Sequence, residues 1–127
     1  MSTNAYVGVV NPDGSIAYIY CHWDGDRLGD VLQEHYQDEA KVRALIALGD
    51  CSSVGERVAP DPDEPHTFHR PANGVTVAYA RDRGEPMQAA QVVPKAVMPR
   101  GFAALFGHLP GDHRIYLYTP EKGWESL

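Results

Sequence analysis

Hydrophobic and polar residues alternate near the N-terminus in a pattern that predicts a β-hairpin. Residues 5–10 form a strand-like run, residues 11–14 read Asn-Pro-Asp-Gly, and residues 16–23 form a returning strand. Pro presets φ for a turn and Gly tolerates a positive φ, so the tetrapeptide is a turn sequence. A period of two then divides the second strand into two faces. One face carries Ile16, Tyr18, Tyr20 and His22, and the other carries Ala17, Ile19, Cys21 and Trp23.

Two helices are predicted after this hairpin. Asp30 can act as the N-cap of the first, because Val31, Leu32, His35 and Tyr36 follow it at helical spacing. The second is expected over residues 39–48, where Val42, Leu45 and Ile46 fall on one stripe. We expect the Asp38 carboxylate to cap this helix and Gly49 to end it.

The remaining sequence alternates between turn-forming and strand-like segments. Residues 50–73, with three prolines between residues 60 and 65, predict an exposed acidic loop. A third strand is expected over residues 75–80, a helix over 88–93 and a short helix over 102–106 that ends at Gly107. Residues 113–118 and a strand starting at Trp124 predict a C-terminal hairpin.

Together these elements predict a single α+β domain over residues 1–127. A chain of 127 residues fits one hydrophobic core of ordinary size. The expected architecture is an antiparallel sheet built from the N- and C-terminal hairpins, with two helices packed on one face.

The net charge, the hydropathy and the cysteine content indicate which partners and which compartment to expect. Seventeen acidic residues against eleven Lys and Arg give a formal net charge of −6, which argues against nucleic acid as a partner. No apolar run approaches the roughly 18 residues of a membrane span, and the N-terminus lacks the blocks of a signal peptide. Two cysteines without a CxxC pattern favour a reducing compartment. We therefore expect a cytoplasmic protein without membrane contact.

The densest polar and aromatic cluster, residues 21–26, is the leading candidate site. It follows a strand, where functional side chains are common, and its expected contact residues are His22, Trp23, Asp24 and Asp26. Cys21 and His22 are adjacent in a strand and point to opposite faces, so they are not expected to form a catalytic dyad. Cys21 could instead meet His35, His66, His69 or Cys51, and a buried core role is favoured for it.

Two further groups could bind ligands. His66 and His69 would share a metal only if the backbone turns between them, and solvated charge is the simpler interpretation of the acidic loop beside them. Arg81 and Arg83, which also belong to the expected contact residues, place guanidinium groups near Tyr79 and Phe68 together with Arg70. Such groups can bind a phosphate or stack on a base, although a surface Arg–Asp network is the favoured interpretation. No phosphate loop, zinc-protease or nucleophile-elbow motif is present, so we expect no cofactor, metal or assigned catalytic residue.

Several segments resemble a family of small, mostly uncharacterised proteins of tailed bacteriophages and prophages. The most specific is the Tyr-Cys-His-Trp-Asp-Gly block at residues 20–25, and a second is the Ala-Leu-Ile-Ala-Leu-Gly-Asp helix end at residues 44–50. The likeness extends to the first strand and turn, to residues 78–84, and to the Tyr-Leu-Tyr and Trp of the C-terminus. Residues 25–29 look shorter than the usual loop of the family.

This resemblance implies a binding protein that counteracts a function of the bacterial host. Its partner would be a host defence protein, blocked in the manner of an anti-CRISPR protein, or a small signalling nucleotide that it sequesters. The first mode predicts an aromatic and acidic face, and the second predicts a pocket of Arg and aromatic residues at an interface of a homo-oligomer. The alternative hypothesis is a small hydrolase or metal-dependent enzyme that uses Cys21, His22, Asp24 or His35.

Overall fold

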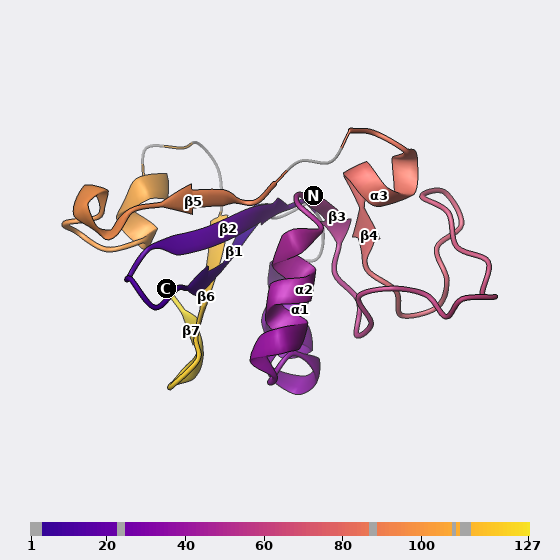
Figure 1. Ribbon diagram of the computed structural model, residues 1–127, viewed down its shortest axis with the longest axis horizontal. Helices are drawn as coiled ribbons and strands as arrows, with labels where there is room; N and C mark the ends of the chain where they lie inside the picture. The colour runs from indigo at the N-terminus through magenta and orange to yellow at the C-terminus, as the bar shows by residue number, and fades with distance from the viewer. Residues whose placement is uncertain (1–3, 23–24, 87–88, 108, 110–112) are drawn as a thin grey trace.

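The computed structural model describes residues 4–22, 25–86, 89–107, 109 and 113–127 (Figure 1). Its helices are α1, α2 and α3, and two short 3₁₀ helices, η1 and η2, lie in the C-terminal half. The helical bounds are α1 Gly25–His35, α2 Glu39–Ala47, α3 Tyr79–Arg83, η1 Lys95–Val97 and η2 Ala103–Phe106. The strands are β1 Asn4–Val10, β2 Ile16–Cys21, β3 Cys51–Ser53, β4 Val77–Ala78, β5 Gln91–Val93, β6 His113–Thr119 and β7 Gly123–Ser126.

The strands form one open sheet. Its order is β4-β3-β2-β1-β6-β7. The strand β3 pairs with the end of β2 at Cys21, and β5 pairs with the beginning of β2 at residues 16–18. Figure 1 shows α1 and α2 on one side of this sheet, and both helices contact its strands. The segment with η2 packs on the other face. The loops around β4 and α3 extend away from the sheet. We call residues 54–84 the loop lobe.

The main hydrophobic core lies between the sheet and the helices α1 and α2. Alternate residues of β1 and β2 point into it, as the period of two requires. Leu28 and Leu32 of α1 and Val42 and Leu45 of α2 are fully buried against them. The opposite face of the N-terminal hairpin is partly covered by other residues, which explains why both faces are hydrophobic.

A second, smaller core covers the opposite face of the sheet. Phe102 and Phe106, from the segment that contains η2, pack on Ile16 of β2 and Ile115 of β6. Gly8 makes this approach possible, because a Cβ atom there would lie 3.3 Å from the Phe102 ring and 2.9 Å from Ile16 Cγ2. The segment after β5 is thereby fixed to the sheet at one end of β2.

The sheet is mixed, so the prediction of a purely antiparallel sheet is wrong. Both predicted hairpins are present, as β1–β2 and β6–β7, and both are antiparallel. They join through β1 and β6, which run parallel, and β3 joins β2 in parallel as well. Parallel neighbours need a long crossover connection, and the intervening helices and loops supply it.

The helices differ in detail from the sequence prediction. α1 begins at Gly25, one and a half turns before the expected cap, so Asp30 lies on an exposed part of the helix interior. Asp38 is the N-cap of α2, but its side chain makes no capping hydrogen bond, contrary to our expectation. Gly49, with φ of 79°, follows the Leu48 cap and ends the helix as expected.

Two predicted elements change type. The expected strand over residues 75–80 shortens to β4, because the Asp82 carboxylate accepts the Ala78 N–H at 2.8 Å and the chain turns into α3. The expected helix over residues 88–93 is instead the strand β5, in which β-branched Val92 and Val93 pair with β2. Among the described residues no helix is long and apolar enough to cross a membrane.

Candidate functional site: a tyrosine face with one carboxylate

The sheet face opposite α1 and α2 carries three tyrosines, which we call the tyrosine face. Tyr6 of β1 pairs in register with Tyr20 of β2, and Tyr18 lies two residues before Tyr20 on the same side. All three side chains are half-buried. The ring centroids of Tyr6 lie 5.6 Å from Tyr20 and 6.3 Å from Tyr18, and Tyr6 stacks on Phe106 at 4.1 Å. The face is therefore an ordered group of aromatic rings that remains partly open to solvent.

The tyrosine hydroxyls are fixed by neighbouring polar groups. The Tyr18 hydroxyl donates to Gln91 Oε1 of β5 at 2.7 Å. The Tyr20 hydroxyl donates to Asn4 Oδ1 at 2.7 Å and lies 2.9 Å from His22 Nδ1. These contacts fix the orientation of the rings, so the face has a preformed shape.

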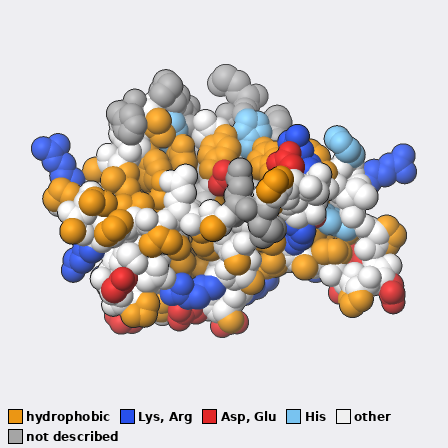
Figure 2. All heavy atoms as spheres, turned by 45° about the horizontal axis from the view of Figure 1, so that its top comes forward, with side chains coloured by type: hydrophobic (Ala, Val, Ile, Leu, Met, Phe, Trp, Pro, Cys, Tyr) orange, Lys and Arg blue, Asp and Glu red, His pale blue; other side chains and the backbone are white. Residues whose placement is uncertain are grey.

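A cavity of about 280 Å³ opens on this face. Its lining residues come from β1 and β2, from the position just before β3, from β5 and from the segment that contains η2: Tyr6, Tyr18, Tyr20, Asp50, Gln91, Leu105, Phe106 and Leu109. Figure 2 shows hydrophobic side chains, drawn in orange, gathered over this side of the molecule, with acidic and histidine side chains near its middle. We call this cavity the tyrosine pocket.

Asp50 gives the tyrosine pocket its charge. Its Oδ1 accepts the backbone N–H of Tyr20 at 3.0 Å, which holds the carboxylate beside the strand. Burial is the largest cause that raises the pKa of Tyr6, Tyr18 and Tyr20, and the negative charge of Asp50 raises each of them further. The carboxylate therefore acts on all three phenols.

A second aromatic group continues from the tyrosine face onto the loop lobe. Burial is the largest cause of the raised pKa of Tyr20, and the nearby Tyr79 of α3 raises it further. The backbone N–H of Tyr79 donates to the Asp50 carbonyl at 3.2 Å. Phe68 lies 5.7 Å from Tyr79 between ring centroids. Arg83 lies over both rings, at 5.3 and 5.8 Å, and pairs with Glu85 at 3.0 Å. The Arg83 guanidinium group therefore covers this second aromatic group, beside the tyrosine face.

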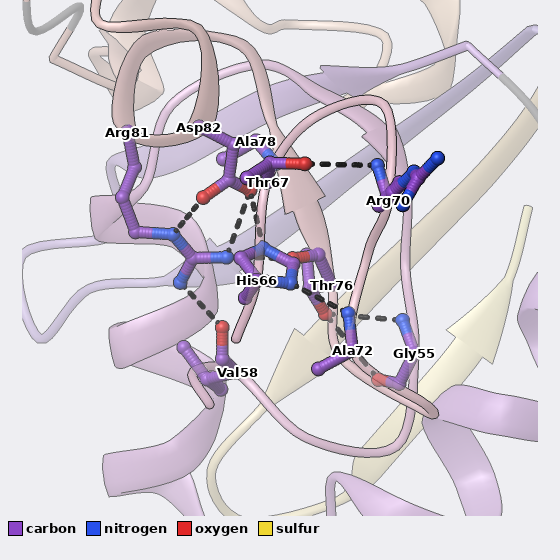
Figure 3. Close-up of polar contacts among 10 residues, drawn as sticks. All are labelled: Gly55, Val58, His66, Thr67, Arg70, Ala72, Thr76, Ala78, Arg81 and Asp82. Carbon is purple, nitrogen blue, oxygen red and sulfur yellow. Dashed lines mark hydrogen bonds and ion pairs between the residues drawn. The ribbon is translucent and has the colours of Figure 1, made fainter. Parts of the chain in front are cut away.

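Arg81 lies inside the loop lobe and donates to internal acceptors (Figure 3). Its guanidinium bonds the Asp82 carboxylate at 2.8 and 3.0 Å and the carbonyls of Val58 and Thr76 at 2.6 Å each. In Figure 3 the side chain of Arg70 lies on the other side of this group and points away from it. Arg81 and Arg70 thus do not converge on one pocket.

His66 completes this internal cluster. The Ala72 N–H donates to its Nδ1 at 2.9 Å, so the ring proton is on Nε2, which lies 3.1 Å from Asp82 Oδ2. That contact is at ion-pair distance without the alignment of a hydrogen bond. Both side chains are only 4% exposed. Because both ring nitrogens face internal groups, the cluster serves to hold the lobe together.

The sequence-predicted site residues are distributed as follows. His22 lies at the edge of the tyrosine face, half-buried beside Tyr20. Arg83 borders the same face through Tyr79, whereas Arg81 belongs to the interior of the loop lobe. Trp23 and Asp24 lie outside the described residues, as does the side chain of Asp26, whose backbone belongs to α1.

The two cysteines are partners across the junction of β2 and β3. They are paired in register, and both are free and fully buried. A hydrogen bond with Cys51 and burial raise the pKa of Cys21 well above its ordinary value. A buried thiol with a raised pKa is a poor nucleophile. The geometry of Cys21 therefore fits the core role that the sequence favoured.

A larger cavity, of about 570 Å³, lies elsewhere, between α1 and the loops at residues 54–56 and 73–74. His35 is on its wall, with its Nε2 3.7 Å from carboxylate oxygens of both Glu34 and Glu56. No group of three His, Cys, Asp or Glu side chains that could hold a metal ion occurs in the described part of the chain. His66 and His69 in particular do not form such a group.

Sequence reasoning missed the residues that give the site its character, which are Tyr6, Asp50 and Gln91. The alternation along residues 16–22 placed Tyr18, Tyr20 and His22 on one face, which was the available signal. The positions of Asp50 and Gln91 depend on the pairing of β3 and β5 with β2, which no local pattern specifies. Comparison of the chain with protein-family models, curated proteins and solved structures gives no significant match.

Proposed function

We propose that this protein is a phage- or prophage-encoded binding protein that counteracts a function of its bacterial host, such as antiviral defence, by contacting a host protein through the tyrosine face. The observation that carries the proposal is the preformed tyrosine pocket around Asp50. Half-exposed aromatic residues anchored in a defined geometry are typical of the energetically dominant part of protein interfaces. The resemblance to phage proteins supplies the biological context.

The charge at this face supports a protein partner over a nucleotide. Asp50 would repel a phosphate group, and no Lys or Arg is among the described residues that line the pocket. The arginines expected to bind a nucleotide have other contacts, since Arg81 bonds internal acceptors and Arg83 pairs with Glu85. Binding that blocks a host defence protein is expected to use an aromatic and acidic face, and the tyrosine face has both properties.

A matched pair of substitutions tests the proposal. Gln91→Arg puts a cationic side chain at the rim of the tyrosine pocket, where Gln91 is exposed. Gln37→Arg makes the same change at an exposed position between α1 and α2, away from the tyrosine face. Each variant is expressed in host cells that carry a phage-defence system, and the plating efficiency of a restricted phage is measured.

We expect the wild type and Gln37→Arg to restore plating equally and Gln91→Arg to lose most of the effect. The same three proteins are used to capture a defence protein, with circular dichroism as the check of folding. Equal activity of both variants would overturn the role of the tyrosine face. A nucleotide released from the purified protein on denaturation, identified by mass spectrometry, would favour sequestration instead.

A further inference from the structure

The tyrosine pocket combines features that select one class of ligand group. Three phenol rings, the Phe106 ring and two leucines supply an apolar wall, and Asp50 supplies a single negative charge. Within the described residues the Tyr20 N–H is the one hydrogen-bond donor to this carboxylate, and no cation lies at ion-pair distance from it. A carboxylate among aromatic rings, without a cationic partner of its own, is complementary to a cation.

We propose that the tyrosine pocket receives the guanidinium group of an arginine side chain from the partner protein. The inference rests on the proposed function, because it names the group that the tyrosine face would recognise. Aromatic rings attract cations through the negative potential of their faces, and a nearby carboxylate adds to that attraction. Burial is the largest cause of the raised pKa values of Tyr6, Tyr18 and Tyr20, and the negative charge of Asp50 adds a smaller contribution to each.

Arginine fits this pocket better than lysine for two reasons. A guanidinium group is planar and stacks on aromatic rings. It is also more weakly hydrated than an ammonium group, so it loses less hydration free energy when it enters an aromatic site. Its forked donors can also serve more than one acceptor. Asp50 and Gln91 both line the pocket. Gln91 Oε1 accepts the Tyr18 hydroxyl, and an amide oxygen has a second lone pair with which it can accept another donor.

The volume and origin of the pocket agree with insertion of one side chain. A cavity of about 280 Å³ is at or below the lower end of the range for small-molecule sites, so it suits one side chain better than a large cofactor. Its walls come from β1, β2, β5 and the segment with η2, and stacked rings and hydroxyl contacts hold them in place. A preformed pocket avoids the entropic cost of ordering its own side chains when a ligand group enters.

The test uses small probes and the purified full chain. Nα-acetyl-arginine methylamide, its lysine counterpart and its citrulline counterpart are titrated into the protein while the tyrosine ring signals are followed by nuclear magnetic resonance. Citrulline has the shape of arginine without its charge. We expect saturable shifts of Tyr6, Tyr18 and Tyr20 with the arginine probe, weaker binding of lysine and none of citrulline.

Two variants decide where the charge acts. Asp50→Asn keeps an oxygen for the Tyr20 N–H and removes the charge, and it should weaken arginine binding by about tenfold or more, a change of roughly 1.4 kcal/mol. Asp61→Asn removes a charge that is 82% exposed in the loop lobe and should change nothing. Equal binding of arginine and citrulline, or unchanged binding by Asp50→Asn, would overturn the inference.

The inference and the proposed function fail in different ways. If Gln91→Arg abolishes the effect on phage plating and Asp50→Asn leaves it intact, the tyrosine face is the interface but arginine is not its ligand. If the arginine probe binds as expected and Gln91→Arg still restores plating, the pocket is real and the proposed function is wrong. Absence of any probe binding to the wild type overturns the inference alone.

Discussion

The Asp50 carboxylate is held beside three phenols, and the phenols can report its charge. Burial and Asp50 together raise the pKa values of Tyr6, Tyr18 and Tyr20 above 10. Asp50→Asn removes one of these causes, so the three pKa values should fall toward the ordinary value of about 10. Titration of the ring signals by nuclear magnetic resonance measures them. Unchanged values in the variant would mean that Asp50 does not act on the pocket, and Asp61→Asn is the matched control.

Asp82 connects three groups inside the loop lobe. Its side chain is 4% exposed and meets Arg81, His66 and the Ala78 N–H. Burial alone would raise the pKa of Asp82, but the hydrogen bonds from Arg81 and Ala78 outweigh it and hold the pKa below the ordinary value. The ionised carboxylate therefore stabilises the folded state, with Arg81 as its main partner.

Asp82→Asn should lower the free energy of unfolding at neutral pH by roughly 3 kcal/mol, because it removes one charge of a largely buried pair. A lowered folded-state pKa contributes stability above the unfolded-state pKa of about 4, and this contribution is lost as the pH falls through the folded-state value. The difference between wild type and variant should therefore shrink below about pH 4. Urea unfolding at several pH values measures it, and a pH-independent difference would contradict the assignment.

At the scale of elements, the β2–β3 junction consists of one residue pair in register, Cys21 and Cys51. Both thiols are fully buried, and a hydrogen bond and burial raise the pKa of Cys21. We expect both thiols to react with a disulfide reagent at least about a hundredfold more slowly in the native protein than in denaturant. Ellman's reagent measures both rates. Rapid native reaction of Cys21 would instead support the alternative hydrolase hypothesis.

The fit between β1 and the segment that contains η2 depends on Gly8. Gly8→Ala would put its Cβ 3.3 Å from the Phe102 ring and 2.9 Å from Ile16 Cγ2, so the second core would be overpacked by about 1–3 kcal/mol. Gly107→Ala is the matched control, because φ there is −65° and, among the described residues, the new Cβ would meet only Ala104 O at 3.7 Å. Chemical denaturation of both variants checks this. Equal stabilities would mean that Phe102 does not pack closely on β1.

Short sequence patterns correctly predicted the turns and helix features that depend on neighbouring residues. The turn at Asn11–Gly14, the stripe of Val42, Leu45 and Ile46, and the helix end at Gly49 all follow from short-range rules, and the structure confirms them. The short helix ending at Gly107 is also present, as η2. These rules act within a few residues along the chain, which is why the sequence suffices.

The wrong predictions are of two kinds. Three are local: α1 begins before Asp30, Asp38 makes no capping hydrogen bond, and residues 79–83 form a helix in which Asp82 accepts the Ala78 N–H. The others concern contacts between distant segments, and residues 91–93 form a strand because β2 offers an unpaired edge. The parallel pairing of β1 with β6 depends on how two hairpins meet. The tyrosine pocket has the same origin, since Asp50 and Gln91 reach Tyr18 and Tyr20 only through such pairings.

At the scale of the whole molecule, two distinct kinds of interaction hold the fold. The sheet with α1 and α2 is held by a continuous hydrophobic core. The loop lobe depends more on polar contacts, namely the Arg81, Asp82 and His66 cluster and the pair of Arg57 with Glu64 at 2.9 Å. Hydrogen bonding with Arg57 lowers the pKa of Glu64 to about 2. The tyrosine face lies on the sheet, so the ligand pocket is built on the part with the larger core.

The net charge of −6 and the single charge of Asp50 should affect binding of a cationic partner in different ways. A field summed over the whole molecule steers the encounter, so the association rate should fall with rising salt in both wild type and Asp50→Asn. A charge inside the contact acts mainly on the dissociation rate, which should rise about tenfold in Asp50→Asn at every salt concentration. Surface plasmon resonance with an arginine-rich peptide, in low and high salt, separates the two rates. If Asp50→Asn changed only the association rate, Asp50 would contribute to steering alone, and the arginine would not enter the pocket.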